Sequence, residues 1–342
     1  MKELWVHAGL PKNGSSALQV FFAKNRKELA KEGIDYLELE NLEDAENGQI
    51  TSGNGVLLAR SLLRQEHPLF FPEANAKIQQ FLALVKSSAY EKGLVSSEFF
   101  SNISIESLKE LKNELDSVGV ELKILFYVRR QDQFLVSSYM QEVKRHGYTG
   151  SLEEFVYSKY KNIHFLNYYG FSRQLSEVIG LGNLKVFRYD LTKNEKEGIV
   201  GHFLKTILGY CPAWVRAEGA VNTSPAPSEL KLMLLANRFQ PRMKFSDFLV
   251  EDSQRVGRST YYPVHNILKP ELAVEVIEHF RDQNNLFFEK YCDDAPFDMK
   301  IDNEYVDLSS LTYSATEVMD IVSGFLVRFD RRLTQLEKIK LK

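Results

Sequence analysis

The feature that most constrains the fold is a glycine-containing turn between two apolar segments near the N-terminus. Residues Leu4 to Ala8 form a short apolar run, which is typical of a buried parallel strand. The turn Gly9-Leu-Pro-Lys-Asn-Gly-Ser-Ser16 follows, and Ser15 to about Lys31 then carries apolar residues at helical spacing before Gly33. A strand, a tight turn and a helix in this order indicate an α/β protein.

The same alternation of strands and helices continues along the chain. Further strands are expected at Ile34–Leu39, Gly93–Ser96, Glu121–Val128 and Leu184–Tyr189. Helices are expected at Val56–Leu63, Ala74–Ala89, Ile105–Leu115, Gln131–Arg145 and after Ser151, where Glu154 completes a capping box. This order predicts an α/β fold with a central parallel sheet flanked by helices on both faces.

The second half of the chain has few strand signals. From Lys196 onward the pattern is mainly helical and ends in a long amphipathic helix that contains Val318, Phe325 and Leu336. No repeat or Pro/Gly-rich linker divides the chain. We therefore expect a single domain over 1–342, with an α/β nucleotide-binding core at 1–190 and a helical completion at 191–342.

Charge and composition exclude several classes of protein. The formal net charge of −3 argues against a general nucleic-acid binder, so any anion site must be built locally. Cys211 and Cys292 match neither a disulfide framework nor a zinc spacing, and no histidine motif predicts a metal site. Pro11 and Lys12 interrupt the N-terminal apolar run, and no long apolar span follows. We expect a cytoplasmic protein without a transmembrane segment.

The turn at residues 9–16 has the outline of a phosphate-binding loop. Its glycines permit a tight turn, and the helix that follows offers free N–H groups to an anion. In the loop of ATP- and GTP-hydrolysing proteins a lysine directly follows the second glycine, whereas here Ser15 takes that place and the lysine is Lys12. No strand ends in a convincing magnesium-binding aspartate, which favours a metal-free donor over ATP or GTP.

The segment HAGLPKNGSSALQ resembles the 5′-phosphosulfate loop of the sulfotransferases that use 3′-phosphoadenosine 5′-phosphosulfate, within a P-loop-like fold. The bacterial glycan-type branch is the expected subgroup. This resemblance implies that Lys12 contacts the oxygen that bridges phosphate and sulfate. It also implies that the rest of the loop cradles the 5′-phosphate, through Gly9, Asn13, Gly14, Ser15 and Ser16.

A second family signature is an arginine that ends a central strand, with a serine eight residues later, and the two bind the 3′-phosphate. In FYVRRQDQFLVSSYMQ, Arg129 and Ser137 match this spacing, and Arg130 with Ser138 is a competing register. An arginine fork suits two phosphate oxygens. For the third family element, a basic loop near the C-terminus, Gly257-Arg258 is the candidate, which makes Arg258 an expected donor contact.

Two residues compete for the role of general base. Glu98 follows the strand expected at Gly93–Ser96, so it lies at the same sheet edge as Lys12 and Arg129. Its neighbours Phe99 and Phe100 could desolvate the carboxylate and raise its pKa toward a useful range. His7, two residues before Gly9, is the rival.

The expected reaction is transfer of a sulfuryl group to a hydroxyl or amine, by metal-free in-line displacement. The acceptor is open and includes a glycan or a small alcohol, and the oligomeric state is also open. Lys144, Arg145 and His146 could contact an acidic acceptor or only complement a helix dipole. The alternatives are a P-loop ATP-dependent kinase, and a catalytically silent nucleotide-binding protein that contacts partners through its C-terminal helix.

Overall fold

The computed structural model describes residues 1–49, 51–216, 225–240, 245–250, 267–301 and 304–340. The chain forms two compact units. The first comprises residues 1–131, 163–222 and 278–298, and the second comprises 132–162, 223–277 and 299–342. The expectation of a single domain divided at residue 190 stays a prediction.

The first unit is built on a parallel sheet of five strands in the order β2-β3-β1-β4-β5. All neighbouring strands are parallel, with His7 opposite Ser96 in one pair and opposite Leu125 in the other. The strands are β1 (Glu3–Ala8), β2 (Ile34–Tyr36), β3 (Lys92–Ser97), β4 (Glu121–Val128) and β5 (Leu184–Arg188). The predicted α/β class with a central parallel sheet is confirmed.

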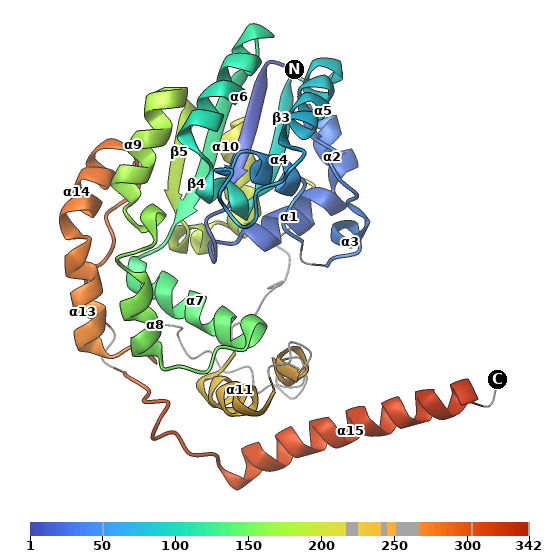
Figure 1. Cartoon of the computed structure of the whole chain (residues 1–342), viewed down its shortest axis with the longest axis vertical. Coiled ribbons are helices and arrows are strands. Elements are labelled where there is room, and N and C mark those ends of the chain that lie inside the picture. Colours follow the sequence, from blue (N-terminus) through green and yellow to red (C-terminus); the bar gives the residue numbers. More distant parts are fainter. Residues whose placement is uncertain (50, 217–224, 241–244, 251–266, 302–303, 341–342) are drawn as a thin grey trace. The chain divides into compact units, whose positions relative to one another are not determined.

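Helices cover both faces of this sheet (Figure 1). On one face α1 (Ser15–Lys24) packs with α10 (Gly198–Leu208), and on the other α6 (Ile105–Ser117) packs with α9 (Tyr168–Ile179). The other helices of this unit are α2 (Arg26–Lys31), α3 (Glu43–Glu46), α4 (Val56–Ser61), α5 (Ala74–Ser87) and α14 (Arg281–Lys290). Short 3₁₀ turns are η1 (Glu98–Asn102), η2 (His164–Leu166), η3 (Leu181–Asn183) and η4 (Asp190–Asn194).

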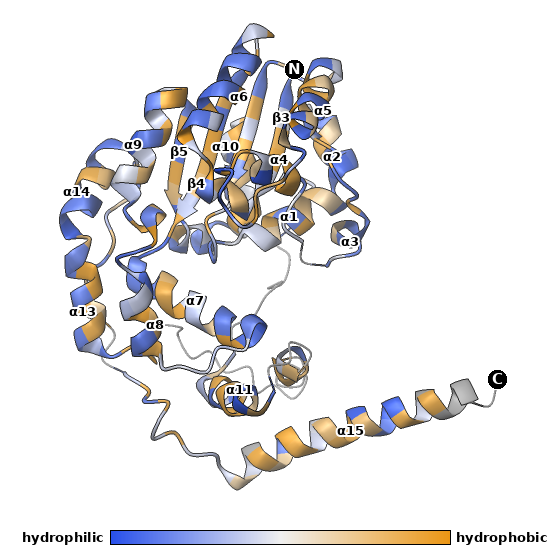
Figure 2. Cartoon of the chain, viewed as in Figure 1, coloured by the Kyte–Doolittle hydropathy of each residue, from blue (hydrophilic) through white to orange (hydrophobic). Residues whose placement is uncertain are grey.

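Alternation along the strands decides which side chains meet which helices. On β4, Tyr127 belongs to the buried cluster formed with Phe22 of α1 and Phe203 of α10. Its neighbour Phe126 points the other way and contacts Phe171 of α9, with ring centres 5.3 Å apart. Both faces of the sheet therefore carry apolar side chains. Figure 2 shows apolar residues along several of the strands.

The single helix expected from Ser15 to Lys31 is instead two helices, and this expectation was wrong. The break is at Asn25, which lies outside helical geometry with φ −109° and ψ 23°. Its side-chain Nδ2 donates to the carbonyl of Phe21 at 2.8 Å. An asparagine that bonds to the backbone in this way competes with helix continuation, so the chain turns before α2.

The regular secondary structure among the described residues of the second unit consists of helices. It contains α7 (Gln131–His146), α8 (Leu152–Lys159), α11 (Pro227–Phe239), a helical stretch at 245–250, most of α13 (Pro270–His279) and α15 (Ala315–Lys340). The capping box predicted at Ser151 and Glu154 is confirmed at the start of α8. Among the helices that the structure describes, none has the length and apolar character needed to cross a bilayer.

Candidate active site

The carboxyl ends of four neighbouring strands bring the predicted residues of the first unit to one sheet edge. The loop 9–16 follows β1, Glu98 follows β3, Arg129 follows β4 and Tyr189 follows β5. In open α/β sheets, ligands bind beyond these strand ends. Because β3 and β4 lie on opposite sides of β1, Glu98 and Arg129 flank the loop from opposite sides.

The loop backbone has two residues with left-handed conformation. Gly14, which caps α1, has φ 82°, and Lys12 has φ 67°. Such a conformation is uncommon for a residue other than glycine and is typical of sites where the surrounding fold imposes it. Ser15 and Ser16 then begin α1, and their N–H groups belong to the first turn, which has no helical partners. The loop therefore offers backbone donors next to a lysine of fixed position.

Gly14 also packs where no side chain fits. A Cβ atom built there would lie 2.6 Å from Cδ1 of Ile199 on α10 and 2.7 Å from Cε2 of Tyr189. The loop thus packs closely against α10 and against Tyr189, which follows β5. Tyr189 therefore contacts the loop at Gly14.

We expect Gly14→Ala to destabilise the fold by about 2–5 kcal/mol, because the left-handed backbone and the crowding both oppose a methyl group. Gly33→Ala is the matched control, since Gly33 has φ 79° but nothing within 4 Å of the position that a Cβ would take. The control should lose only about 1–2 kcal/mol, from backbone strain alone. Denaturant unfolding measures both losses, and equal losses would contradict tight packing at Gly14.

Asn13 anchors the loop to the sheet. Its side chain is buried, and Nδ2 donates to the carbonyl of Tyr127 on β4 at 2.7 Å. The resemblance to the sulfotransferase loop implied a contact of Asn13 with the 5′-phosphate. The amide side chain adds a structural role, because it fixes the loop relative to β4, the strand that carries Arg129.

Glu98 and Lys12 act on each other electrostatically. Glu98 begins η1 and is half-buried, and this burial raises the pKa of its carboxyl group, while the positive charge of Lys12 lowers it. The cap of η1 is not Glu98 but Ser97, whose hydroxyl accepts from the N–H of Phe99 at 3.3 Å. Ser97, and not the carboxylate of Glu98, therefore caps η1.

Arg129 and Arg130 have different surroundings. The guanidinium of Arg129 lies over the ring of Tyr189, 4.6 Å from its centre, and burial lowers the pKa of Arg129 from its ordinary value. The carbonyl of Arg129 accepts from the hydroxyl of Tyr168 at 2.6 Å. Arg130 is buried and donates to the carbonyl of Asp298 at 2.5 Å, so its fork is engaged with the backbone. This geometry favours Arg129 as the arginine for a ligand.

Tyr189 is the residue of this site that sequence reasoning missed. Its ring lies against the space above Gly14 and beneath the guanidinium of Arg129, so it links the two motifs. The only signal in the sequence was its place at the end of a predicted strand. The neighbouring Arg188 donates to both carboxylate oxygens of Asp190, at 2.5 and 3.2 Å. The carboxylate of Asp190 is therefore engaged in an ion pair.

His7 lies below the loop and inside the sheet. Its ring is 1% exposed, Nδ1 is 2.8 Å from the hydroxyl of Ser96, and the ring packs edge-on against Phe203. Burial lowers the pKa of His7 to about 3, so its ring is neutral at physiological pH. Gln19 of α1 donates to the same hydroxyl at 3.2 Å. These contacts describe a histidine that ties β1 to β3 and α1.

Three predicted donor contacts lie outside the described part of the first unit. Ser137, which is buried, and Ser138 both lie on α7 in the second unit, so their pairing with Arg129 or Arg130 stays a prediction. Arg258 lies outside the described residues. Lys144 and Arg145 are 3.4 and 2.7 Å from Asp247, so both are engaged in ion pairs within the second unit.

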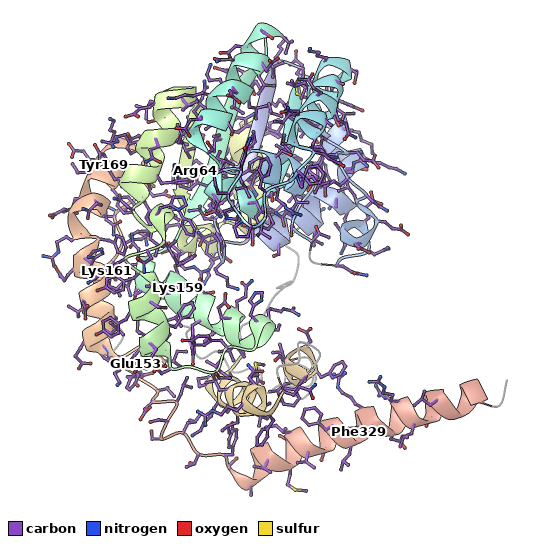
Figure 3. All side chains as sticks on the ribbon, in the orientation of Figure 1. Arg64, Glu153, Lys159, Lys161, Tyr169 and Phe329 are labelled. Carbon is purple, nitrogen blue, oxygen red and sulfur yellow. The ribbon has the colours of Figure 1, made fainter. Side chains whose placement is uncertain are left out.

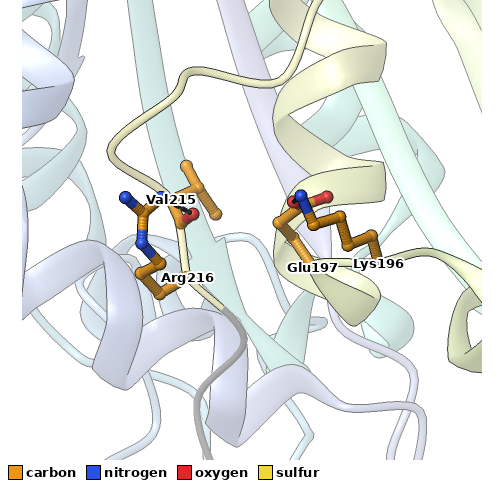
Figure 4. A pocket seen from close by; sticks show the side chains of 4 residues that line it. All are labelled: Lys196, Glu197, Val215 and Arg216. Atoms are coloured by element: carbon orange, nitrogen blue, oxygen red, sulfur yellow. Dashed lines mark hydrogen bonds and ion pairs between the residues drawn. The ribbon is translucent and has the colours of Figure 1, made fainter.

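Two cavities of the first unit are lined by other residues than Lys12, Glu98 and Arg129. One of about 390 Å³ is lined by Lys196, Glu197, Val215 and Arg216, with the first two facing the last two across it (Figure 4). Another, of about 500 Å³, is lined by residues of α14 and the segment after it: Asn285, Phe288, Glu289, Cys292, Asp293, Asp294 and Pro296. Neither cavity includes Lys12, Glu98 or Arg129. The candidate site is therefore identified by the residues at the carboxyl ends of the strands.

Comparison with known proteins gives little further assignment. No protein-family model matches the chain. An uncharacterised protein of Archaeoglobus fulgidus is 27% identical over 207 residues, which are 58% of this chain and 53% of that protein. The chain thus spans about half the length of this curated relative. A crystal structure of a sulfotransferase from Alicyclobacillus acidocaldarius is similar over 69% of this chain and 93% of that one, with 14% identity and a TM-score of 0.38.

Proposed function

We propose that this protein is a sulfotransferase that moves a sulfuryl group from 3′-phosphoadenosine 5′-phosphosulfate to a hydroxyl or amine, such as one on a carbohydrate. The observation that carries the proposal is the order of groups along one sheet edge. Glu98, the loop with Lys12, and Arg129 lie at the ends of three adjacent strands. This order matches a base, a charge-stabilising cation and a phosphate-binding arginine.

The loop supplies the contacts for the 5′-phosphosulfate. N–H groups at the start of α1 point to an anion placed there, and the helix dipole favours its charge. Lys12 would lie beside the bridging oxygen, by the resemblance of the loop to that of sulfotransferases. A lysine there stabilises the negative charge that this oxygen gains as the sulfur–oxygen bond breaks.

Arg129 is proposed to bind the 3′-phosphate. Its planar fork can donate to two phosphate oxygens, and the ring of Tyr189 beneath it holds the guanidinium in one orientation. The donor would then run from the loop toward the β4 and β5 side. Glu98 lies on the other side of the loop, where the acceptor would enter.

This placement suits an in-line displacement. The acceptor oxygen or nitrogen forms a bond to sulfur as the bridging oxygen leaves on the opposite side. Glu98 takes the proton of the acceptor, and the products are the sulfated acceptor and adenosine 3′,5′-bisphosphate. A half-buried carboxylate with a raised pKa is suited to accept that proton.

Ligand-induced thermal stabilisation tests the donor assignment. We expect adenosine 3′,5′-bisphosphate without metal to raise the melting temperature by several degrees, since a ligand at 100 times its Kd stabilises by about 2.7 kcal/mol. AMP lacks the 3′-phosphate and should bind about 10- to 100-fold more weakly, because charge-assisted hydrogen bonds are lost. ATP with magnesium as the better ligand would instead indicate a kinase.

The arginines provide the matched pair of variants for this experiment. Arg129→Ala should remove most of the difference between the two nucleotides. Arg130→Ala should lower the starting stability, since it breaks the bond to the carbonyl of Asp298, but should keep the difference. If Arg130→Ala removes the difference and Arg129→Ala does not, the competing register is correct.

A further inference from the structure

One side of the helix α15 is covered within the second unit. Phe325 stacks on Phe245 with ring centres 5.3 Å apart and an angle of 6°. One turn further, the guanidinium of Arg328 lies 4.4 Å from the ring centre of Phe248. Before the helix, Lys231 of α11 donates to the carbonyl of Ser309 at 3.0 Å. This side of α15, with Phe325 and Arg328, therefore packs against the stretch 245–250.

An apolar stripe of α15 is exposed, and we call it the α15 seam. Its residues recur at alternating intervals of three and four positions, which is the a/d spacing of a coiled coil. Each is substantially open to solvent, from 43% exposed for Val322 to 65% for Phe329, which Figure 3 labels on α15. The seam consists of Met319, Val322, Leu326, Phe329, Leu333 and Leu336.

Scattered apolar residues on a surface are ordinary, but a continuous stripe of large ones is not. Figure 2 shows the apolar colouring that extends along α15. Burying the exposed part of these side chains would cover roughly 100 Å² for each, hence on the order of 1,200 Å² between two such helices. That area reaches the lower end of the range for specific protein–protein interfaces.

We propose that the α15 seam is the interface through which two copies of this chain associate as a two-stranded coiled coil. An a/d stripe fits best against another stripe of the same spacing, because its side chains insert between four residues of the facing helix. A second copy supplies that spacing by symmetry. The partner that we infer for the α15 seam is thus the same seam of a second copy of this chain.

Sedimentation equilibrium of the full-length protein over a range of concentrations tests this proposal. We expect a dimer with a Kd on the order of micromolar, as for a small specific interface. Leu326→Asp should weaken the dimer by about 100-fold or more, since it places a charge in the seam. Phe329→Asp should do the same. The control is Val327→Asp, because Val327 is 51% exposed but lies outside the seam on the same helix.

Circular dichroism should be unchanged in all three variants, since each site is on the surface. A wild type that stays monomeric at concentrations well above micromolar would overturn the proposal, and would mean that the seam is covered by another part of the same chain. Equal weakening by Val327→Asp and Leu326→Asp would also overturn it. So would a dimer that survives both seam variants.

Discussion

Glu98→Gln is expected to lower turnover by about 10²–10⁴, the usual contribution of a positioned general base. The substitution removes the basic oxygen and keeps the shape of the side chain. Neutral hydroxyl groups are poor nucleophiles, so loss of the base affects the chemical step and not the binding of donor. Turnover with an identified acceptor, measured beside stabilisation by adenosine 3′,5′-bisphosphate, separates the two effects.

His7→Asn is the comparison that decides between the two candidate bases. Because His7 is buried and its pKa is about 3, we expect this variant to lose stability but to keep turnover in the folded fraction. If His7→Asn abolishes turnover with the fold and donor binding preserved, and Glu98→Gln is near normal, the base is His7.

The raised pKa of Glu98 also predicts an effect of Glu98→Gln on stability. A carboxyl group that is harder to ionise in the folded state makes folding less favourable as pH rises from the ordinary glutamate pKa through the raised one. At neutral pH, Glu98→Gln removes this penalty and should raise the melting temperature, while turnover falls. In the wild type, turnover should fall as pH drops through the raised pKa, because protonated Glu98 cannot accept a proton.

Lys12→Ala is expected to lower turnover by about 10²–10³, by analogy with the removal of one preorganised group that stabilises transition-state charge. Folding should survive, because Lys12 lies in a loop and alanine must adopt the same left-handed backbone. Stabilisation by adenosine 3′,5′-bisphosphate, which lacks the sulfate, should be largely kept. Lys24→Ala, which removes an exposed lysine from the other end of α1, is the control for net charge.

The pH profile of the Lys12→Ala variant provides an independent test. The charge of Lys12 lowers the pKa of Glu98, so its removal should move the acidic fall in turnover to higher pH. An unshifted profile would contradict the coupling between these two side chains. Wild-type turnover in Lys12→Ala would exclude the lysine from the mechanism.

Local patterns in the sequence were sufficient to predict the sheet. All five strands were predicted within a few residues, because each is an apolar run bounded by turn residues. The common position of Lys12, Glu98 and Arg129 at one edge followed from parallel strand direction. The order of strands, which sets Glu98 and Arg129 on opposite sides of the loop, depends on packing between distant segments and was not predicted.

Contacts between distant residues were also beyond the sequence. The spacing predicted Arg129 as the phosphate ligand and left Arg130 as a competing register. Their surroundings differ, since Arg129 lies over Tyr189 and Arg130 bonds to the carbonyl of Asp298. The bond from Asn13 to the carbonyl of Tyr127 joins residues 114 positions apart. On α15 the amphipathic pattern was visible, but its division into a covered and an exposed side required the position of 245–250.

At position 12, the stability of the fold and the proposed reaction favour different residues. The left-handed backbone favours glycine, whereas the reaction needs the positive charge of Lys12. Glycine would adopt φ 67° without a steric penalty, whereas for a lysine this conformation costs about 1–2 kcal/mol. Laboratory evolution that selects only for heat resistance would therefore favour glycine at residue 12, and would gain robustness by discarding the cation proposed to act in the reaction. Stabilised variants of this protein should keep position 12 fixed, and should draw their mutations from sites far from the strand ends.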